Sequence, residues 1–270
     1  MIVNGFKTKA EAMRYLQAQG HKFTSILSRP ESNPKVAKNG KLGVLSVPLH
    51  LAPFNLSGFQ VCPQASAGCA AACLHTAGNP AHMSGKDASR KDKTLAYFKH
   101  RDAFMAVLVY EIAALVTKAA KLNMTPAVRL NATSDLPWEH RKVTVDGGEC
   151  LLMDLFDMVQ FYDYTKVTKR AIAHAEGRMP SNYHLTFSKT EDNDRAVSKV
   201  LEMGGNVAVV FSAERYKRSV ADGEALVCGT VAGVFDGDQS DYRPMDPQGV
   251  IVALKAKGDA RSDTSGFTVR

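Results

Sequence analysis

The sequence lacks most of the features that mark secreted and membrane proteins. Residues 1–13 carry Lys7, Lys9 and Glu11 and contain no apolar stretch of the kind that a secretory signal requires. No uninterrupted apolar run is long enough to cross a bilayer, so no membrane partner is expected. The five cysteines are an odd number, which argues against a disulfide framework. Together these absences predict a protein of the cytoplasm, which is a reducing compartment.

Extremes of composition are missing as well. Hydrophobic residues make up 45% and charged residues 23% of the 270 residues, as in an ordinary globular protein with a substantial core. The formal net charge of +7 permits attraction to nucleic acid or to an anionic small molecule but requires neither. Composition leaves the oligomeric state undecided.

Three of the five cysteines, Cys62, Cys69 and Cys73, stand within a dozen positions. Thiolates are soft ligands that select zinc, copper(I) or iron–sulfur clusters, and ligands so close in sequence converge on one centre at a small cost in chain entropy. Structural zinc sites usually have four ligands in Cys-x-x-Cys pairs, and the sequence contains no such pair. The triplet therefore predicts a [4Fe–4S] or [3Fe–4S] cluster with one iron open to substrate, solvent or a fourth ligand.

The fourth ligand stays open, because His75, Cys150 and Cys228 are all available. Since Cys150 and Cys228 are flanked by apolar residues, we interpret them as packed core cysteines. A zinc ion held by the triplet and His75 is the alternative metal site, and it would make the cysteine loop a structural element of the fold.

Short strand and helix patterns alternate along the chain after a long apolar helix pattern at Lys93 to Leu122. Such alternation is typical of parallel strands joined by right-handed crossovers, and no glycine-rich dinucleotide motif follows any strand. We predict an α/β fold, namely a complete or partial β/α barrel (TIM barrel-like) with mostly parallel strands. An open doubly wound sheet is the alternative. The predicted organisation is an N-terminal helix and linker over residues 1–41 and a single barrel-like domain over residues 42–270.

The predicted strands are Leu42 to Leu51, Ala127 to Thr133, Met158 to Thr165, Asn182 to Ser188, Asn206 to Ser212 and Val250 to Lys255. The other predicted helices are Thr8 to Gln19, Leu151 to Phe156, Val167 to Glu176, Asp192 to Met203 and Glu214 to Val220.

Polar side chains gather near the carboxyl ends of the predicted strands, where barrel enzymes build their active sites. If the cysteine loop follows the first strand, it lies at the same edge as these groups. The predicted substrate-binding residues are Arg129, Asn131 and Asp135. The predicted catalytic residues are Asp163, Lys166, His184 and Lys189. Either lysine would hold an anionic group of the substrate, and the aspartate or the histidine would transfer protons.

The stretch Asp236-Gly237-Asp238-Gln239-Ser240-Asp241 has oxygen-bearing side chains at alternate positions, as a calcium loop does. It lacks the glutamate that closes an EF-hand loop. Because Asp and Gly dominate turns, we interpret this stretch as a hydrogen-bonded turn that holds the last strand.

Several stretches carry a resemblance to a known family. They are Leu45-Ser46-Val47-Pro48, the cysteine triplet, Ala77-Gly78-Asn79, Asp236-Gly237-Asp238, Asp241-x-Arg243 and Asp246-Pro247-x-Gly249-Val250-Ile251-Val252. Together they resemble the phage "gene product 88" family from about Leu42 to Gly258. That family is similar in outline to radical-SAM enzymes, so the resemblance implies a β/α fold with the cysteines as cluster ligands. The spacing here differs from the Cys-x-x-x-Cys-x-x-Cys of radical-SAM enzymes, and family members tend to have Tyr where this chain has Leu74.

The leading hypothesis is an iron–sulfur protein of a phage, located in the host cytoplasm. Its open iron would face a polar barrel pocket and bind or transform a small molecule. Radical-SAM-like chemistry, with S-adenosylmethionine on the cluster, is one version of this hypothesis. The alternative is a nucleic-acid-binding phage accessory protein in which a structural or redox-sensing cluster, or a zinc ion, stabilises the fold.

Overall fold

The chain folds into two compact units, each made of two stretches of sequence. The computed structural model describes residues 1–30, 34–73 and 84–270. Unit 1 comprises Met1–Cys62 and Met83–Phe161, and unit 2 comprises Pro63–His82 and Tyr162–Arg270. His75 and the stretch Ala77-Gly78-Asn79 lie outside the described residues, so the role of His75 as a fourth ligand stays a prediction.

Eight strands form one sheet, in the order β1-β2-β5-β6-β7-β10-β9-β8. The pairs β1–β2, β2–β5, β6–β7, β7–β10 and β9–β10 are parallel, whereas β8 and β9 pair antiparallel. The strands of this sheet are β1 (Val44–Pro48), β2 (Thr125–Arg129), β5 (Gln160–Thr165), β6 (Tyr183–Ser188), β7 (Val207–Phe211), β8 (Glu224–Val227), β9 (Thr230–Asp236) and β10 (Ile251–Lys255).

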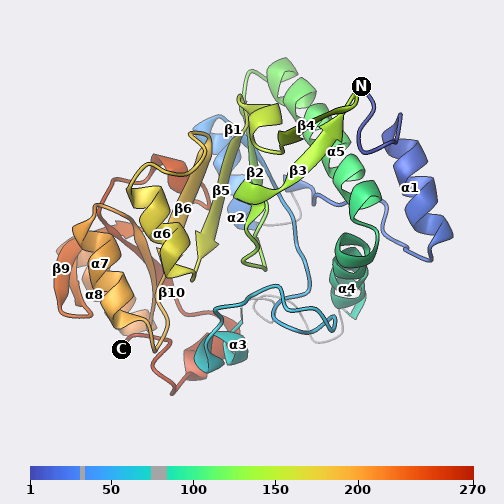
Figure 1. Ribbon diagram of the computed structural model, residues 1–270. Coiled ribbons are helices and arrows are strands. Elements are labelled where there is room, and N and C mark those ends of the chain that lie inside the picture. Colours follow the sequence, from blue (N-terminus) through green and yellow to red (C-terminus); the bar gives the residue numbers. More distant parts are fainter. Residues whose placement is uncertain (31–33, 74–83) are drawn as a thin grey trace. The chain divides into compact units, whose positions relative to one another are not determined.

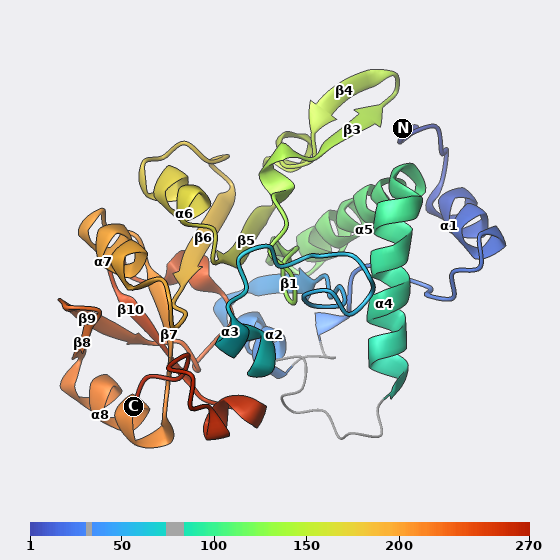
Figure 2. The same cartoon turned by 60° about the horizontal axis from the view of Figure 1, so that its bottom comes forward.

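Among the described α-helices, two precede β1 in the sequence, and the others follow it. The α-helices are α1 (Lys9–Ala18), α2 (Pro34–Lys38), α3 (Ala67–Ala71), α4 (Ser84–Lys99), α5 (Arg101–Lys121), α6 (Thr168–Ala175), α7 (Asp194–Glu202) and α8 (Ala213–Asp222). The 3₁₀ helices are η2 (Asn39–Leu42), η3 (Trp138–His140), η4 (Asp154–Phe156), η5 (Arg243–Met245) and η6 (Gly258–Ser262). A separate hairpin of β3 (Lys142–Val145) and β4 (Gly148–Leu151) extends away from β1 in Figure 2.

The predicted α/β class with mostly parallel strands is confirmed, but a closed barrel is not found among the described strands. The strand order has two ends, β1 and β8, and a barrel requires every strand to have two neighbours. At one end, β8 and β9 are joined by Cys228-Gly229, whose φ angles of +53° and +79° suit a tight two-residue hairpin turn. The chain therefore reverses after β8 instead of crossing over to a parallel neighbour.

Each predicted strand corresponds to an observed one, namely β1, β2, β5, β6, β7 or β10. The first predicted helix is also confirmed, because the Thr8 hydroxyl accepts the backbone N–H of Glu11 at 3.1 Å and caps α1. The buried face of α1, which includes Met13 and Leu16, packs against α5 in unit 1 (Figure 1). Apolar periodicity and a capping residue are local signals, which is why the sequence predicted these elements well.

The long helix predicted at Lys93 to Leu122 is instead two helices, α4 and α5, which break at His100. The backbone of His100 has φ −134° and ψ 51°, outside the helical region. Its ring packs edge-on against Tyr15 and His21, with ring centroids 5.8 and 5.3 Å apart. No glycine or proline marks the break, so the long-range packing of the His100 ring accompanies a bend that local sequence does not signal.

Among the described residues, α5 is long and apolar enough to cross a membrane by length and composition, although Glu111 interrupts its apolar run. More than half of its apolar stretch is buried, and it packs against α1, α4 and β2 within unit 1. Those contacts are typical of a core helix in a globular unit.

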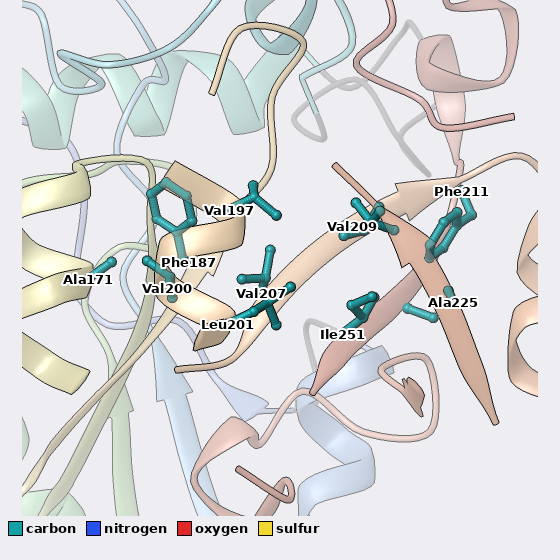
Figure 3. Packing of buried hydrophobic residues seen from close by; sticks show 12 residues of the cluster. Ala171, Phe187, Val197, Val200, Leu201, Val207, Val209, Phe211, Ala225 and Ile251 are labelled. Carbon is teal, nitrogen blue, oxygen red and sulfur yellow. The ribbon is translucent and has the colours of Figure 1, made fainter. Parts of the chain in front are cut away.

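The core of unit 2 lies around β6, β7 and β10, which parallel pairing and flanking helices bury (Figure 3). Val207, Val209 and Phe211 of β7 are fully or almost fully buried. On α7, Val197, Val200 and Leu201 stand at helical spacing and pack into the same cluster. The continuous apolar run of β7 is thus the pattern of a strand in the middle of a parallel sheet.

The acidic turn after β9 holds the last strand, as interpreted from the sequence. The backbone N–H of Gly237 donates to the carbonyl oxygen of Ala253 at 2.9 Å. The Asp238 carboxylate accepts the N–H of Lys255 at 3.4 Å and the ammonium of Lys257 at 3.0 Å. These bonds tie the turn to the end of β10.

Replacing Phe187 with alanine should remove a large side chain from the core of unit 2. Phe187 is 1% exposed and belongs to the main cluster, so we expect Phe187→Ala to lower the free energy of unfolding by about 3 to 5 kcal/mol. Urea denaturation measures this loss. The control Leu226→Ala truncates a side chain that is 57% exposed and should change stability by less than about 0.5 kcal/mol. Equal losses in the two variants would contradict the position of the core.

Candidate functional site

Cys62 lies at the carboxyl ends of β1 and β2 in unit 1. Its Sγ accepts the backbone N–H of Phe54 at 3.4 Å and lies 3.9 Å from the carbonyl oxygen of Thr133. The N–H of Asp135 donates to the carbonyl oxygen of Val61, the residue before Cys62, at 2.8 Å. The cysteine is therefore held against the loop that follows β2, with one backbone N–H directed at its sulfur.

Asn131 organises that same loop through its side-chain amide, which is 2% exposed. Its Oδ1 accepts the Leu136 N–H at 2.9 Å, the Ser134 hydroxyl at 2.8 Å and the Trp138 indole N–H at 3.1 Å. Its Nδ2 donates to the carbonyl oxygen of Leu136 at 2.9 Å. One buried amide thus supplies hydrogen-bond partners to polar groups of a turn, which lie outside any strand ladder or α-helix.

The other two predicted substrate-binding residues belong to the same part of unit 1. Arg129 is the last residue of β2 and is partly exposed. Asp135 is buried, and its backbone is bonded to Val61. Unit 1 therefore gathers all three predicted substrate-binding residues along the chain segment that packs on Cys62, and their role in binding stays a prediction.

The other two cysteines of the triplet belong to unit 2, where Cys69 lies on the short helix α3. Ser66 caps this helix, because its Oγ accepts the N–H of Cys69 at 3.1 Å. The same hydroxyl donates to Oε2 of Glu191 at 2.6 Å, and the Gly68 N–H donates to Oε1 of Glu191 at 2.6 Å. One carboxylate thus binds the start of the cysteine-bearing helix to the loop after β6.

Cys69 packs against a small apolar cluster of Ala72, Ala256, Ala260 and Phe267. Consistent with this cluster, Figure 1 shows α3 beside the red C-terminal helix η6. All five cysteines of the chain are reduced thiols of intermediate exposure, so Cys150 and Cys228 are not fully buried core residues as interpreted from the sequence.

The three thiols suit a metal centre by their chemistry, since thiolate ligands select zinc or iron–sulfur clusters. The structure describes them on separate segments, Cys62 in unit 1 and Cys69 with Cys73 in unit 2. Over residues 1–30, 34–73 and 84–270, no three His, Cys, Asp or Glu side chains are gathered closely enough to hold a metal ion.

Lys189, a predicted catalytic residue, lines a cavity of about 420 Å³ in unit 2. Its side chain is 8% exposed, and its Nζ donates to the carbonyl oxygen of Thr190 at 2.9 Å and contacts Asp194 at 3.2 Å. The Cys228 thiol donates to the same aspartate at 3.0 Å. Burial, together with this bond to Asp194, raises the pKa of the Cys228 thiol to about 12, so the thiol stays protonated at neutral pH. Asp263, Thr268 and Arg270 also line the cavity.

Asp163 is fully buried and belongs to a hydrogen-bonded cluster between β5, β6 and α6. Its Oδ2 accepts the Tyr183 hydroxyl at 2.9 Å, and that hydroxyl accepts Nη2 of Arg170 at 2.9 Å. Lys166 has a different neighbour, since its Nζ donates to the Ser188 hydroxyl at 3.4 Å. Asp163, Lys166 and Lys189 thus all belong to unit 2, where Asp163 bonds to Tyr183, Lys166 to Ser188 and Lys189 to Thr190.

His184 lies on β6 with its ring 5.0 Å from that of His174 on α6. Burial lowers the pKa of His184 to about 3, with smaller contributions from His174 and Arg243. Burial also lowers the pKa of His174. Both rings are therefore neutral at physiological pH. In a proton transfer, His184 would act as a weak base.

A family model described as gene product 88 matches residues 25–270, which include all three cysteines of the triplet and every strand of the main sheet. The chain belongs to the gene product 88 family. This membership places it among phage gene products, as the sequence motifs indicated. No match to the chain was found among curated proteins or among solved structures.

In this member of the gene product 88 family, Glu191 is the site residue that sequence reasoning missed. It stands 125 residues from Ser66, and nothing local in the sequence links the two. The partial signal was Ser66 itself, because a serine three residues before Cys69 is a typical helix cap. A cap can be predicted from spacing, whereas its long-range acceptor depends on the tertiary structure.

Asn131→Ala should destabilise the loop after β2. We expect the free energy of unfolding to fall by about 2 to 4 kcal/mol, because the buried N–H and hydroxyl groups of that loop lose their acceptor. Chemical denaturation measures the change. The control is Asn55→Ala, which alters an exposed asparagine of unit 1 and should change stability by less than about 0.5 kcal/mol. A similar small effect at Asn131 would contradict its role in holding the loop.

His184 should make the protein less stable in acid. Its pKa falls from 6.5 in the unfolded chain to about 3 in the folded state, so the unfolded chain takes up the proton first as the pH drops. The contribution of the neutral His184 ring to the free energy of unfolding is fully present above pH 6.5 and is lost as the pH falls toward about 3. His184→Gln should flatten the decline in the free energy of unfolding over this window. Denaturation at several pH values tests it, with His140→Gln, an exposed histidine, as the variant that should keep the wild-type slope.

Proposed function

We propose that this protein is an iron–sulfur protein in which Cys62, Cys69 and Cys73 hold a [4Fe–4S] cluster with one iron open to a small-molecule ligand. The observation that carries the proposal is that specific hydrogen bonds fix the segments that bear two of the thiols. The Phe54 N–H donates to the sulfur of Cys62, and the Cys69 N–H is fixed by the Ser66 cap. Such hydrogen bonding around thiolates orients cluster ligands and tunes their potential.

The donor set supports this proposal. Three thiols fit a cubane cluster that leaves one iron without a protein ligand, and their partial exposure gives iron access to them. Small residues around Cys69 let the backbone wrap closely, as Gly68 and the alanines of α3 show. An open iron supplies Lewis acidity or an electron when the cluster is bound. Radical-SAM-like chemistry with S-adenosylmethionine is one version of this function.

The cavity lined by Lys189 offers space for the small-molecule ligand. Its wall includes Gly266 and Thr268, which flank Phe267, and Phe267 packs in the cluster that contacts Cys69. The cavity and the cysteine-bearing helix thus share one loop of unit 2. In the proposed function, the ammonium of Lys189 holds the anionic part of the small molecule.

Metal analysis tests the proposal. Protein purified without oxygen should be brown, with iron and acid-labile sulfide in comparable amounts and no stoichiometric zinc. Cys62→Ala, Cys69→Ala and Cys73→Ala should each lose the visible absorption and most of the iron, because each removes a ligand. Cys150→Ala and Cys228→Ala are matched controls that should keep both.

Three results count against the proposal. Colourless protein with one zinc would support the structural zinc site, since zinc–thiolate centres do not absorb visible light. Iron that survives all three substitutions would exclude the triplet as its ligands. Protein without metal after anaerobic purification would overturn the proposal. The nucleic-acid-binding alternative is tested separately, since it predicts binding that weakens steeply with salt.

A further inference from the structure

Glu191 makes an unusual pair of contacts for a residue so far from the cysteines in sequence. Both of its carboxylate oxygens accept bonds of 2.6 Å from the turn that begins α3, one from the Ser66 hydroxyl and one from the Gly68 N–H. Short bonds to an ionised acceptor are the stronger class of hydrogen bond. The carboxylate therefore holds the capping residue and the second residue of a five-residue helix whose third residue is Cys69.

The bonds form a relay that ends at the backbone of Cys69. Because an ionised carboxylate only accepts, the Ser66 hydroxyl must donate the hydrogen bond to Glu191. Its lone pairs are then available to the Cys69 N–H, which donates to Ser66 at 3.1 Å. The charge on Glu191 thus fixes the direction of the Ser66 hydroxyl, and the hydroxyl fixes the peptide that carries the thiol.

Gly68 is what lets the carboxylate come so close. A Cβ built on Gly68 would lie 2.1 Å from Oγ of Ser265 and 2.8 Å from Oε2 of Glu191, far inside ordinary contact distances. Any side chain at this position would push the helix away from Glu191 or displace Ser265. Glycine is required here because the side chains of Ser265 and Glu191 approach its backbone closely. Its backbone conformation does not require glycine, since Gly68 has no positive φ.

The loop that carries Glu191 is itself held firmly. Asn193 accepts the Thr190 N–H at 2.8 Å and donates to the carbonyl oxygen of Ser188 at 3.0 Å. The Thr190 hydroxyl donates to Asp192 at 2.7 Å. This network fixes the loop directly after β6, so Glu191 is presented to the cysteine-bearing helix from a rigid element of the sheet.

We propose that Glu191 is a positioning residue for the cluster site, which orients Cys69 as a ligand through Ser66 and Gly68. This inference rests on the proposed function, because it assigns Glu191 a role toward the cluster held by the triplet. Ligand-orienting groups outside the coordination sphere commonly change metal affinity by about 10- to 100-fold when they are removed. Glu191 would act in this way without touching the metal.

The test compares Glu191→Ala, Glu191→Gln and Gly68→Ala with wild-type protein that holds iron. Loss of Glu191 should speed iron release to a chelator by about 10-fold or more and shift the visible spectrum of the remaining cluster. Glu191→Gln should fall between wild type and Glu191→Ala, since its amide oxygen still accepts the Gly68 N–H but its nitrogen does not accept from Ser66. Gly68→Ala should resemble Glu191→Ala, because it separates the same groups.

A matched control separates positioning from general stabilisation. Glu111 in unit 1 also accepts two backbone N–H groups, from Ile26 at 3.1 Å and from Leu27 at 2.7 Å. Glu111→Gln should lower the thermal midpoint while leaving the rate of iron release unchanged. Equal iron release in wild type, Glu191→Ala and Glu191→Gln would overturn the inference, as would faster release in Glu111→Gln than in Glu191→Gln.

A second readout uses the metal-free protein. Alkylation of Cys69 by iodoacetamide, followed by mass spectrometry of its peptide, should be several-fold faster in Glu191→Ala, because the helix no longer packs Cys69 against its apolar cluster. An unchanged alkylation rate would show that Glu191 does not order this segment. If wild-type protein never holds iron, the proposed function fails by itself, and the alkylation rate still decides whether Glu191 positions Cys69.

Discussion

The need to satisfy buried backbone groups governs how this protein holds its loops. A loop that leaves a parallel strand has N–H and C=O groups that no ladder pairs, and their burial without partners is costly. Here a side-chain carboxylate or amide repeatedly supplies the missing partner. Asn131 does this after β2, Asn193 after β6 and Asp238 after β9.

The same interaction brings the chemistry-bearing residues into place. In unit 1, the loop held by Asn131 is the one whose backbone contacts Cys62 and the residue before it. In unit 2, the loop held by Asn193 presents Glu191 to the helix of Cys69 and Lys189 to the cavity. The carboxyl ends of parallel strands therefore carry both the structural acceptors and the candidate site residues, as is usual for α/β proteins.

This arrangement changes the meaning of several polar residues. Asn131 and Asp163 are buried and surrounded by specific partners, so their hydrogen bonds contribute to holding a loop and a strand pair. His184 is half-buried and neutral next to His174, which makes its ring part of the packing between β6 and α6. Lys189 differs from these residues, because its ammonium lies in the wall of a cavity.

The sequence by itself determined the α/β class, six of the eight strands of the sheet, the cap of α1 and the family to which the chain belongs, whereas β8 and β9 were not predicted. Those features depend on local periodicity, on capping chemistry and on short motifs, all of which a sequence contains directly. Tertiary structure decided three other features: the break at His100, the antiparallel end of the sheet and the hydrogen bond from Ser66 to Glu191. Each of them depends on a contact or pairing whose energy appears after distant segments meet, which local propensity does not encode.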